Sequence, residues 1–140
     1  MMMMMMQPVA AALLAHGSIN PVVTQDNIQT TICVPGWTAT VRPPASYTDH
    51  LKLQQMAQFN LPGSPSDYEE DHAIPLALGG NPTDPTNLSP QDWPDAHKKD
   101  RLEVYLHKLV CHGRLGLTDA QVEISTDWRV SYAARFGVQP

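Results

Sequence analysis

The chain reads Tyr68-Glu-Glu-Asp-His-Ala-Ile-Pro-Leu-Ala-Leu-Gly-Gly-Asn-Pro-Thr-Asp-Pro-Thr-Asn-Leu-Ser-Pro90 across the stretch that decides its fold. Asp71 and His72 set a carboxylate beside an imidazole, and the carboxamide of Asn87 follows fifteen residues after His72. Glycine and proline in between favour the tight turns of a loop. A hard oxygen ligand, a neutral base and a loop-fixing group are what metal-assisted phosphodiester hydrolysis requires. This stretch is therefore the candidate site.

The same stretch predicts a short hairpin that leads into a long helix. Residues 69–78 have the pattern of a strand with a turn, residues 79–82 form the bend, and Asn87-Leu88 returns toward the first strand. The helix is predicted over about residues 95–112 and ends at Gly113. Its apolar positions follow the amphipathic spacing, and they are Leu102, Tyr105, Leu106, Leu109 and Val110.

Outside this stretch the expected elements are short. A helix is possible over 20–33, with Asn20 as its cap, and the alternation of Trp37 to Val41 indicates a strand. Ser46 or Thr48 starts a helix that runs to about residue 59. Residues 60–67 form a loop, and a last helix is expected from Thr118 to about residue 136.

Length and composition indicate one small, loop-rich domain. The chain has 140 residues with 13 prolines and 8 glycines, which favours an α+β domain over a regular bundle or sandwich. We expect residues 1–20 to be a low-complexity leader, either disordered or signal-like, and residues 21–140 to be a single domain. No apolar run reaches the ~20 residues that cross a membrane. Neither a cytoplasmic nor a secreted location is indicated.

The distribution of charge gives arguments both for and against nucleic-acid binding. A net charge of −5 counts against a strong nonspecific nucleic-acid binder. The segment from His97 to Arg114, however, holds five Lys/Arg against two acidic residues. An acidic protein with one basic stripe can still face a phosphate backbone locally.

The two cysteines, Cys33 and Cys111, are too few and too far apart for a zinc finger. They form either one disulfide or two buried free thiols, and the redox compartment decides between them.

The candidate stretch resembles the HNH (His-Me finger) endonucleases. The resemblance is carried by Asp71-His72, by Pro75-Leu76, by Leu78-Gly79-Gly80 and by Asn87-Leu88. It extends over about residues 20–130 through stretches that match Thr31–Trp37, Arg42–Pro44, Lys99–Glu103, Val110-Cys111, Ala120-Gln121 and Asp127-Trp128. The presence of both cysteines in matching stretches favours their pairing.

The resemblance implies a fold and a chemistry. The fold is a ββα-metal finger at about residues 68–112, embedded in a mainly helical, loop-rich α+β domain. The activity is hydrolysis of DNA with Mg²⁺, or with Mn²⁺ as a substitute. Asp71 is then a metal ligand and Asn87 holds the loop. His72 is the expected general base, since an imidazole titrates near neutral pH.

The third residue of the finger is open. The matching slot, nine residues after Asn87, is Ala96. We predict the adjacent His97 as the metal ligand by residue type, while Asp100, Glu103 and His107 are alternatives by helical face. Lys99 and Arg101 are either phosphate contacts or ordinary solvated charges.

The alternative function is a non-catalytic module that binds nucleic acid or protein and keeps the finger only as a scaffold. A third reading is a secreted protein in which the finger is structural and a disulfide ties it together. Protein partners and oligomeric state are not indicated by the sequence.

Overall fold

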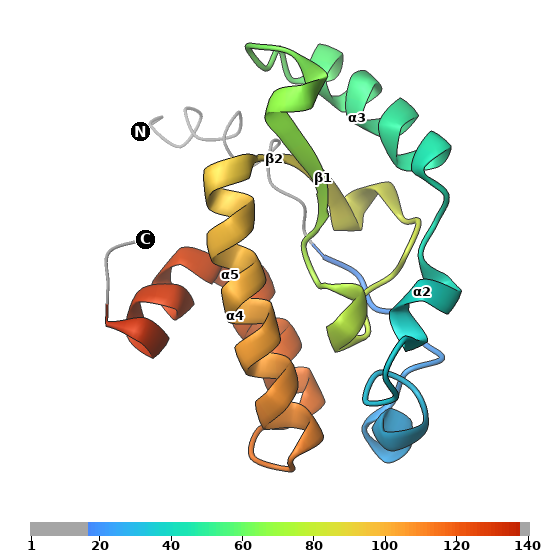
Figure 1. The fold of residues 1–140 in the computed structure, drawn as a ribbon, viewed down its shortest axis with the longest axis vertical. Coiled ribbons are helices and arrows are strands. Elements are labelled where there is room, and N and C mark those ends of the chain that lie inside the picture. Colours follow the sequence, from blue (N-terminus) through green and yellow to red (C-terminus); the bar gives the residue numbers. More distant parts are fainter. Residues whose placement is uncertain (1–16, 138–140) are drawn as a thin grey trace, which may run out of the picture.

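The computed structural model describes residues 17–137 and shows a small α+β domain (Figure 1). Its sheet is a two-stranded antiparallel hairpin of β1 (Tyr68–His72) and β2 (Leu88–Asp92), in which Asp71 lies opposite Ser89 and His72 opposite Leu88. The helix α3 (Ala45–Gln58) contacts both strands, and α4 (Trp93–Cys111) leads directly out of β2. The expected hairpin followed by a helix is therefore confirmed, but β1 ends at His72, and Leu76–Leu78, expected at the end of the first strand segment, form a 3₁₀ turn.

The long helix α4 forms where the amphipathic pattern predicted it, starting two residues earlier than expected. The Asp92 side chain caps it by accepting a hydrogen bond from the Asp95 amide at 3.0 Å, and Pro94 lies in its first turn. One face is buried through Leu102, Leu106 and Val110. Burial of these apolar side chains anchors the helix against the rest of the domain.

The last helix, α5 (Leu117–Phe136), lies beside α4 and completes the core (Figure 1). Its backbone is kinked at Asp127, where φ is −159° and ψ is 91°. The Asp127 carboxylate accepts hydrogen bonds from the amides of Arg129 and Val130, as an N-cap residue does. The second half of α5 thus starts with its own cap.

The segment before the finger differs from expectation in two places. Instead of a helix over 20–33 there is only the 3₁₀ turn η2 (Gln25–Thr30). The predicted strand over Trp37–Val41 is wrong, because these residues form the short helix α2. Five alternating residues fit one and a half helical turns equally well, and Arg42-Pro43-Pro44 then ends the helix.

The chain immediately before η2 is part of the finger. Ile19 forms a β-bridge with Gly80, and the Asn20 amide donates to the Gly79 carbonyl at 2.8 Å. Residues 17–20, which the sequence grouped with the leader, therefore pack on the loop. The rest of the leader expected over residues 1–20, namely residues 1–16, lies outside the described residues.

A disulfide joins Cys33, just after η2, to Cys111 at the end of α4. It ties the N-terminal segment to the long helix across 78 positions of sequence. The pairing favoured by the resemblance is the one observed. Among the described residues, no helix is both long and apolar enough to cross a bilayer.

Candidate functional site

The hairpin distributes its acidic and basic groups over two faces. Successive side chains of a strand point to opposite faces, so Glu69 and Asp71 face α4, while Glu70 and His72 lie on the other side of β1. Asp71 contacts Lys99 of α4, which fixes the first face. His72 is the last residue of β1. The two predicted site residues are thus neighbours in the chain at the point where the strand becomes a loop, and their side chains point to opposite faces of the hairpin.

Asn87 holds the loop between the strands. Its side chain is completely buried, and its Oδ1 accepts hydrogen bonds from the amides of Ile74 at 3.0 Å and Ser18 at 3.1 Å. Its Nδ2 donates to the carbonyls of Ile74 at 3.1 Å and Asn81 at 2.9 Å. One carboxamide therefore satisfies four backbone groups drawn from three segments, which is full use of its hydrogen-bonding capacity.

Two glycines allow the loop to close on itself. Gly79 has a φ of 79°, a conformation that side-chain-bearing residues rarely adopt. A Cβ atom at Gly80 would lie 1.7 Å from the Ile74 carbonyl oxygen, so only glycine fits there. The Gly-Gly pair is a packing requirement of this loop.

The His72 imidazole is held in one orientation. Its Nε2 lies 2.9 Å from the Pro82 carbonyl oxygen. A carbonyl only accepts, so in this bond Nε2 carries the proton, and the neutral ring keeps the lone pair on Nδ1. Burial lowers the pKa of His72, an effect that the Pro82 bond and Asp71 partly offset. The ring is therefore neutral over a wider pH range than a free imidazole.

Asp71 is paired with a buried ammonium group. Lys99 Nζ lies 2.7 Å from Asp71 Oδ2 and donates to the His72 carbonyl at 2.6 Å. The Lys99 side chain is only 4% exposed. Lys99 is thus not an ordinary solvated charge, and that interpretation of the sequence is wrong. It fixes the end of β1 through both residues of the Asp-His pair.

More carboxylates surround Lys99 than one ammonium can neutralise. Burial raises the pKa of Glu69, and the Asp71 and Asp100 charges raise it further. Burial likewise raises the pKa of Glu103 to about 7; Lys99 opposes this shift, and the three other carboxylates add to it. Glu69 Oε1 is buried without a hydrogen-bond partner. The face of β1 toward α4 therefore carries excess negative charge, which attracts cations.

This donor chemistry fits a hard divalent cation, since Mg²⁺ prefers carboxylate oxygens. On the face of β1 toward α4, the carboxylate of Asp71 and the unpartnered oxygen of Glu69 are the candidate metal ligands. Their ligand atoms do not converge with a third in this structure. Within residues 17–137 the sole group of three potential ligands within 4.8 Å of one another is Cys33, His107 and Cys111.

His97 lies on the exposed surface of α4. Its ring is 5.7 Å from that of Trp93, centroid to centroid, and its charge reaches Glu69 and Asp100, whose pKa values it lowers slightly. The structure brings it close to the acidic face but not into a group of three ligands with Asp71. Of the alternatives, Asp100 and Glu103 lie on this face, and His107 lies beside the disulfide.

Two groups of the site were missed by sequence reasoning. Glu69 alternates with Asp71, and this period of two could have identified it. The charge of Arg42, just after α2, lowers the pKa of His72, an interaction between distant parts of the sequence that no local pattern reveals. Arg101, in contrast, stacks on Phe136 at 3.9 Å, so the basic stripe on α4 is only partly available to a ligand.

Glu70 makes the stability of the domain depend on pH. Both of its carboxylate oxygens are buried without a partner, and burial raises its pKa to about 8, against the opposing charge of Lys52. The unfolded value is 4.5. The folded state thus binds the proton more tightly, so this contribution to stability is full below pH 4.5 and is lost as the pH rises through 8.

We expect Glu70→Gln to remove much of this dependence. Between pH 5 and 9 the variant should lose about 2 kcal/mol less unfolding free energy than the parent, because one pKa unit corresponds to about 1.4 kcal/mol and solvent screening of this partly exposed residue reduces the effect by about half. Urea unfolding at each pH measures this, and Asp49→Asn, at an exposed carboxylate of α3, is the control. Parallel curves for parent and Glu70→Gln would show that Glu70 is not the group responsible.

Comparison with known proteins gives no relative. No family model, no curated protein and no solved structure matches this chain. A functional assignment therefore rests on the chemistry of the hairpin, its loop and α4.

Proposed function

We propose that the protein is a metal-dependent DNA endonuclease of the HNH type. In this proposal His72 is the general base that takes a proton from the attacking water, and Asp71 is a ligand of the divalent metal. Asn87 keeps the loop in the shape that aims the imidazole. The hairpin and α4 then correspond to the ββα-metal finger.

The orientation of His72 is the observation that carries the proposal. A general base needs a free lone pair, a neutral form near the working pH and a fixed direction. The Pro82 carbonyl supplies the direction by binding Nε2–H, which leaves Nδ1 as the acceptor. The lowered pKa of His72 supplies the neutral form. A histidine in a merely structural turn needs neither property.

The loop and the charges around it support the same assignment. Asn87 ties the residues after His72 to the start of β2, so the imidazole and Asp71 sit on a rigid frame. Preorganised positions of this kind are what an active site requires. Arg42 provides a cationic side chain on the His72 side, suited to a phosphate of the DNA backbone.

Asp71 and Glu69 would hold the metal, which is Mg²⁺ in the proposal, or Mn²⁺. When bound, such an ion stabilises negative charge on the phosphate and leaving oxygens. The Asp71 carboxylate has to exchange the Lys99 ammonium for the metal or share itself between them. His97 remains a predicted further ligand of the metal. Glu69 is proposed as a ligand because its side chain lies on the same face of β1 as Asp71.

One observation favours the non-catalytic alternative. The Lys99–Asp71 ion pair already neutralises the carboxylate that a metal would use, and buried ion pairs are costly to break. If that pair persists, the finger is a scaffold that binds nucleic acid or protein. Binding to DNA would then be unaffected by a chelator.

Cleavage of supercoiled plasmid with Mg²⁺, with Mn²⁺ and with EDTA distinguishes the two functions. We expect nicking with either metal and none with EDTA. Asp71→Asn should raise the metal concentration for half-maximal nicking by about 10- to 100-fold, whereas Asp49→Asn, on the exposed surface of α3, should leave it unchanged. The absence of nicking with any metal, combined with chelator-resistant DNA binding, would replace the nuclease by the non-catalytic module.

A further inference from the structure

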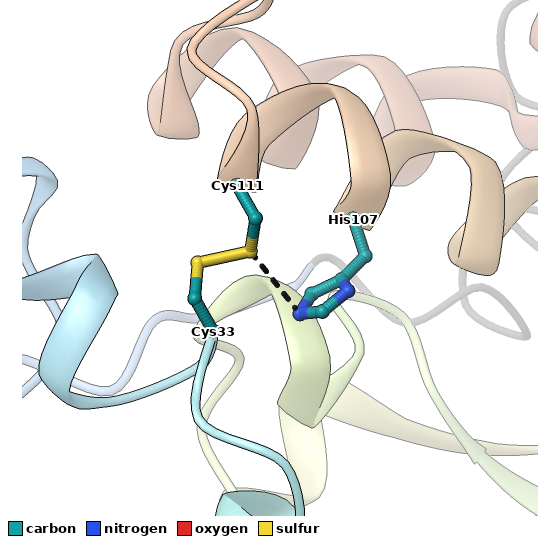
Figure 2. A group of neighbouring side chains, drawn as sticks. All are labelled: Cys33, His107 and Cys111. Carbon is teal, nitrogen blue, oxygen red and sulfur yellow. Dashed lines mark hydrogen bonds between the residues drawn. A yellow bond between two sulfur atoms is a disulfide. The ribbon is translucent and has the colours of Figure 1, made fainter.

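Three potential metal ligands lie close together at the C-terminal end of α4, the end farther from the β1–β2 hairpin. Figure 2 shows His107 and Cys111 on successive turns of α4, with Cys33 reaching them from the segment after η2. Their ligand atoms all lie within 4.8 Å of one another. Residues four apart on a helix share a face, so α4 presents an imidazole and a sulfur together to the third residue.

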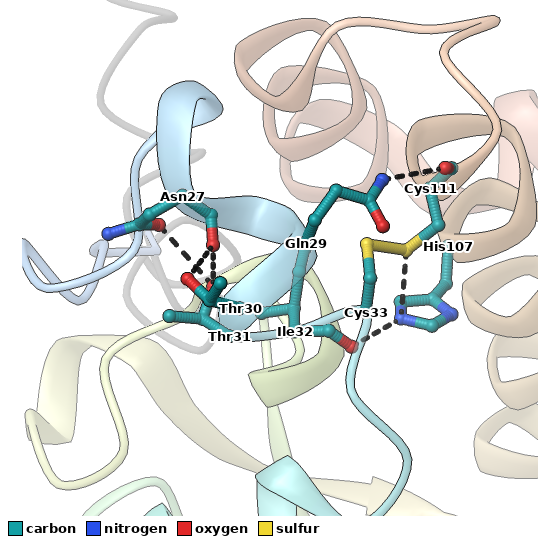
Figure 3. Close-up of a disulfide and its surroundings, with 8 residues drawn as sticks. All are labelled: Asn27, Gln29, Thr30, Thr31, Ile32, Cys33, His107 and Cys111. Carbon is teal, nitrogen blue, oxygen red and sulfur yellow. Dashed lines mark hydrogen bonds between the residues drawn. A yellow bond between two sulfur atoms is a disulfide. The ribbon is translucent and has the colours of Figure 1, made fainter.

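Contacts other than the disulfide also join the segment around Cys33 to α4. Gln29 Nε2 donates to the Cys111 carbonyl at 2.9 Å, and His107 Nε2 lies 2.8 Å from the Ile32 carbonyl oxygen (Figure 3). The side chains of Ile28 and Ile32 are buried in the core. The backbone around Cys33 is therefore anchored to α4 by more than the disulfide.

From this arrangement we propose that the reduced chain binds a Zn²⁺ ion through Cys33, His107 and Cys111, with water in the fourth position. Thiolate and imidazole are the ligands that zinc prefers, at about 2.3 and 2.0 Å in a tetrahedron. Such a tetrahedron places a nitrogen and a sulfur about 3.5 Å apart. His107 Nε2 and Cys111 Sγ are 3.5 Å apart already.

Reduction of the disulfide creates the two thiol ligands of the zinc site. A dithiol reductant delivers two electrons and two protons, becomes a cyclic disulfide itself, and leaves Cys33 and Cys111 as thiols. Zinc then displaces both thiol protons to solvent. The His107 proton moves from Nε2 to Nδ1, which frees the Nε2 lone pair and gives up the bond to Ile32. Both states link residues 33 and 111, so η2 stays attached to α4 in oxidising and in reducing surroundings.

The test uses the full-length chain, reduced with a dithiol and freed of it without oxygen. Metal analysis after dialysis against Zn²⁺ should give one ion more per reduced chain than per oxidised chain. Co²⁺ in place of zinc should give the absorption of thiolate-to-cobalt charge transfer. Zinc should also raise the thermal midpoint of the reduced chain by about 5 °C, with the far-UV circular dichroism showing retained helix.

Variants assign the ligands. His107→Ala and Cys33→Ser should each weaken zinc binding by about 100-fold or more, because even the loss of an outer partner costs 10- to 100-fold. His112→Ala, at an exposed histidine next to the cluster, should bind zinc as the parent does. The proposal is overturned if the reduced parent takes up no zinc, if it loses its helix signal and zinc does not restore it, or if His107→Ala binds as tightly as the parent. None of these outcomes bears on the nuclease assay.

Discussion

Replacing His72 with alanine is expected to reduce metal-dependent plasmid nicking by about 10²- to 10⁴-fold, the contribution of a positioned general base. The variant keeps Asp71 and Asn87, so metal affinity and loop shape should change little. What it loses is the Nδ1 lone pair that the Pro82 bond leaves free. Initial nicking rates at saturating Mg²⁺ measure the effect, because they separate the proton transfer from metal binding.

The matched control is His50→Ala, which removes an exposed imidazole of α3. It should nick at the parent rate. Circular dichroism and the thermal midpoint show whether His72→Ala remains folded, as a cavity at a buried ring also costs stability. A folded His72→Ala that nicks as fast as the parent would remove His72 from the reaction and leave Asp71 and its metal without the proposed base.

Some of this site could be predicted because it depends on local pattern. The Asp-His pair, the glycine-rich bend and Asn87 are close in sequence, and a hairpin brings such residues together without help from the rest of the chain. The amphipathic spacing of α4 likewise predicted its buried face at Leu102, Leu106 and Val110.

The burial of Lys99 could not be predicted from the sequence because its partner, Asp71, lies on another element, β1. Its position three residues before Leu102 places it at the edge of the apolar stripe, where a charged residue usually reaches solvent. Only the approach of β1, which brings the Asp71 carboxylate and the His72 carbonyl, makes burial of the ammonium favourable. Such a pairing depends on tertiary packing, which helical periodicity does not encode.

The ambiguity at Trp37–Val41 and the contacts of residues 17–20 have the same origin. A five-residue alternating segment fits a strand or a helix, and in this fold Trp37–Val41 forms the short helix α2 and does not join the sheet of β1 and β2. The Ser18 amide finds its acceptor on Asn87, 69 positions away in sequence. Long-range hydrogen bonds of this kind place residues 17–20 on the loop.

Asn87→Ala is expected to destabilise the domain by about 4 kcal/mol. The substitution removes two acceptor and two donor interactions and leaves the buried carbonyl and amide of Ile74 unpaired. Each buried polar group left unsatisfied costs about 1–3 kcal/mol, and the alanine also leaves a small cavity. Some of the loss is recovered because Ser18 and Asn81 lie closer to solvent and can bind water.

Urea unfolding of Asn87→Ala beside Gln54→Ala, which shortens an exposed carboxamide of α3, measures this cost against a surface change of at most about 0.5 kcal/mol. Because Asn87 aims His72 without touching the reacting groups, nicking by the folded fraction should fall while the metal dependence stays that of the parent. A loss of stability below about 1 kcal/mol would mean that Gly79, Gly80 and the bridge to Ile19 already fix the loop. The hydrogen bonds of the carboxamide would then contribute little to the stability of the loop.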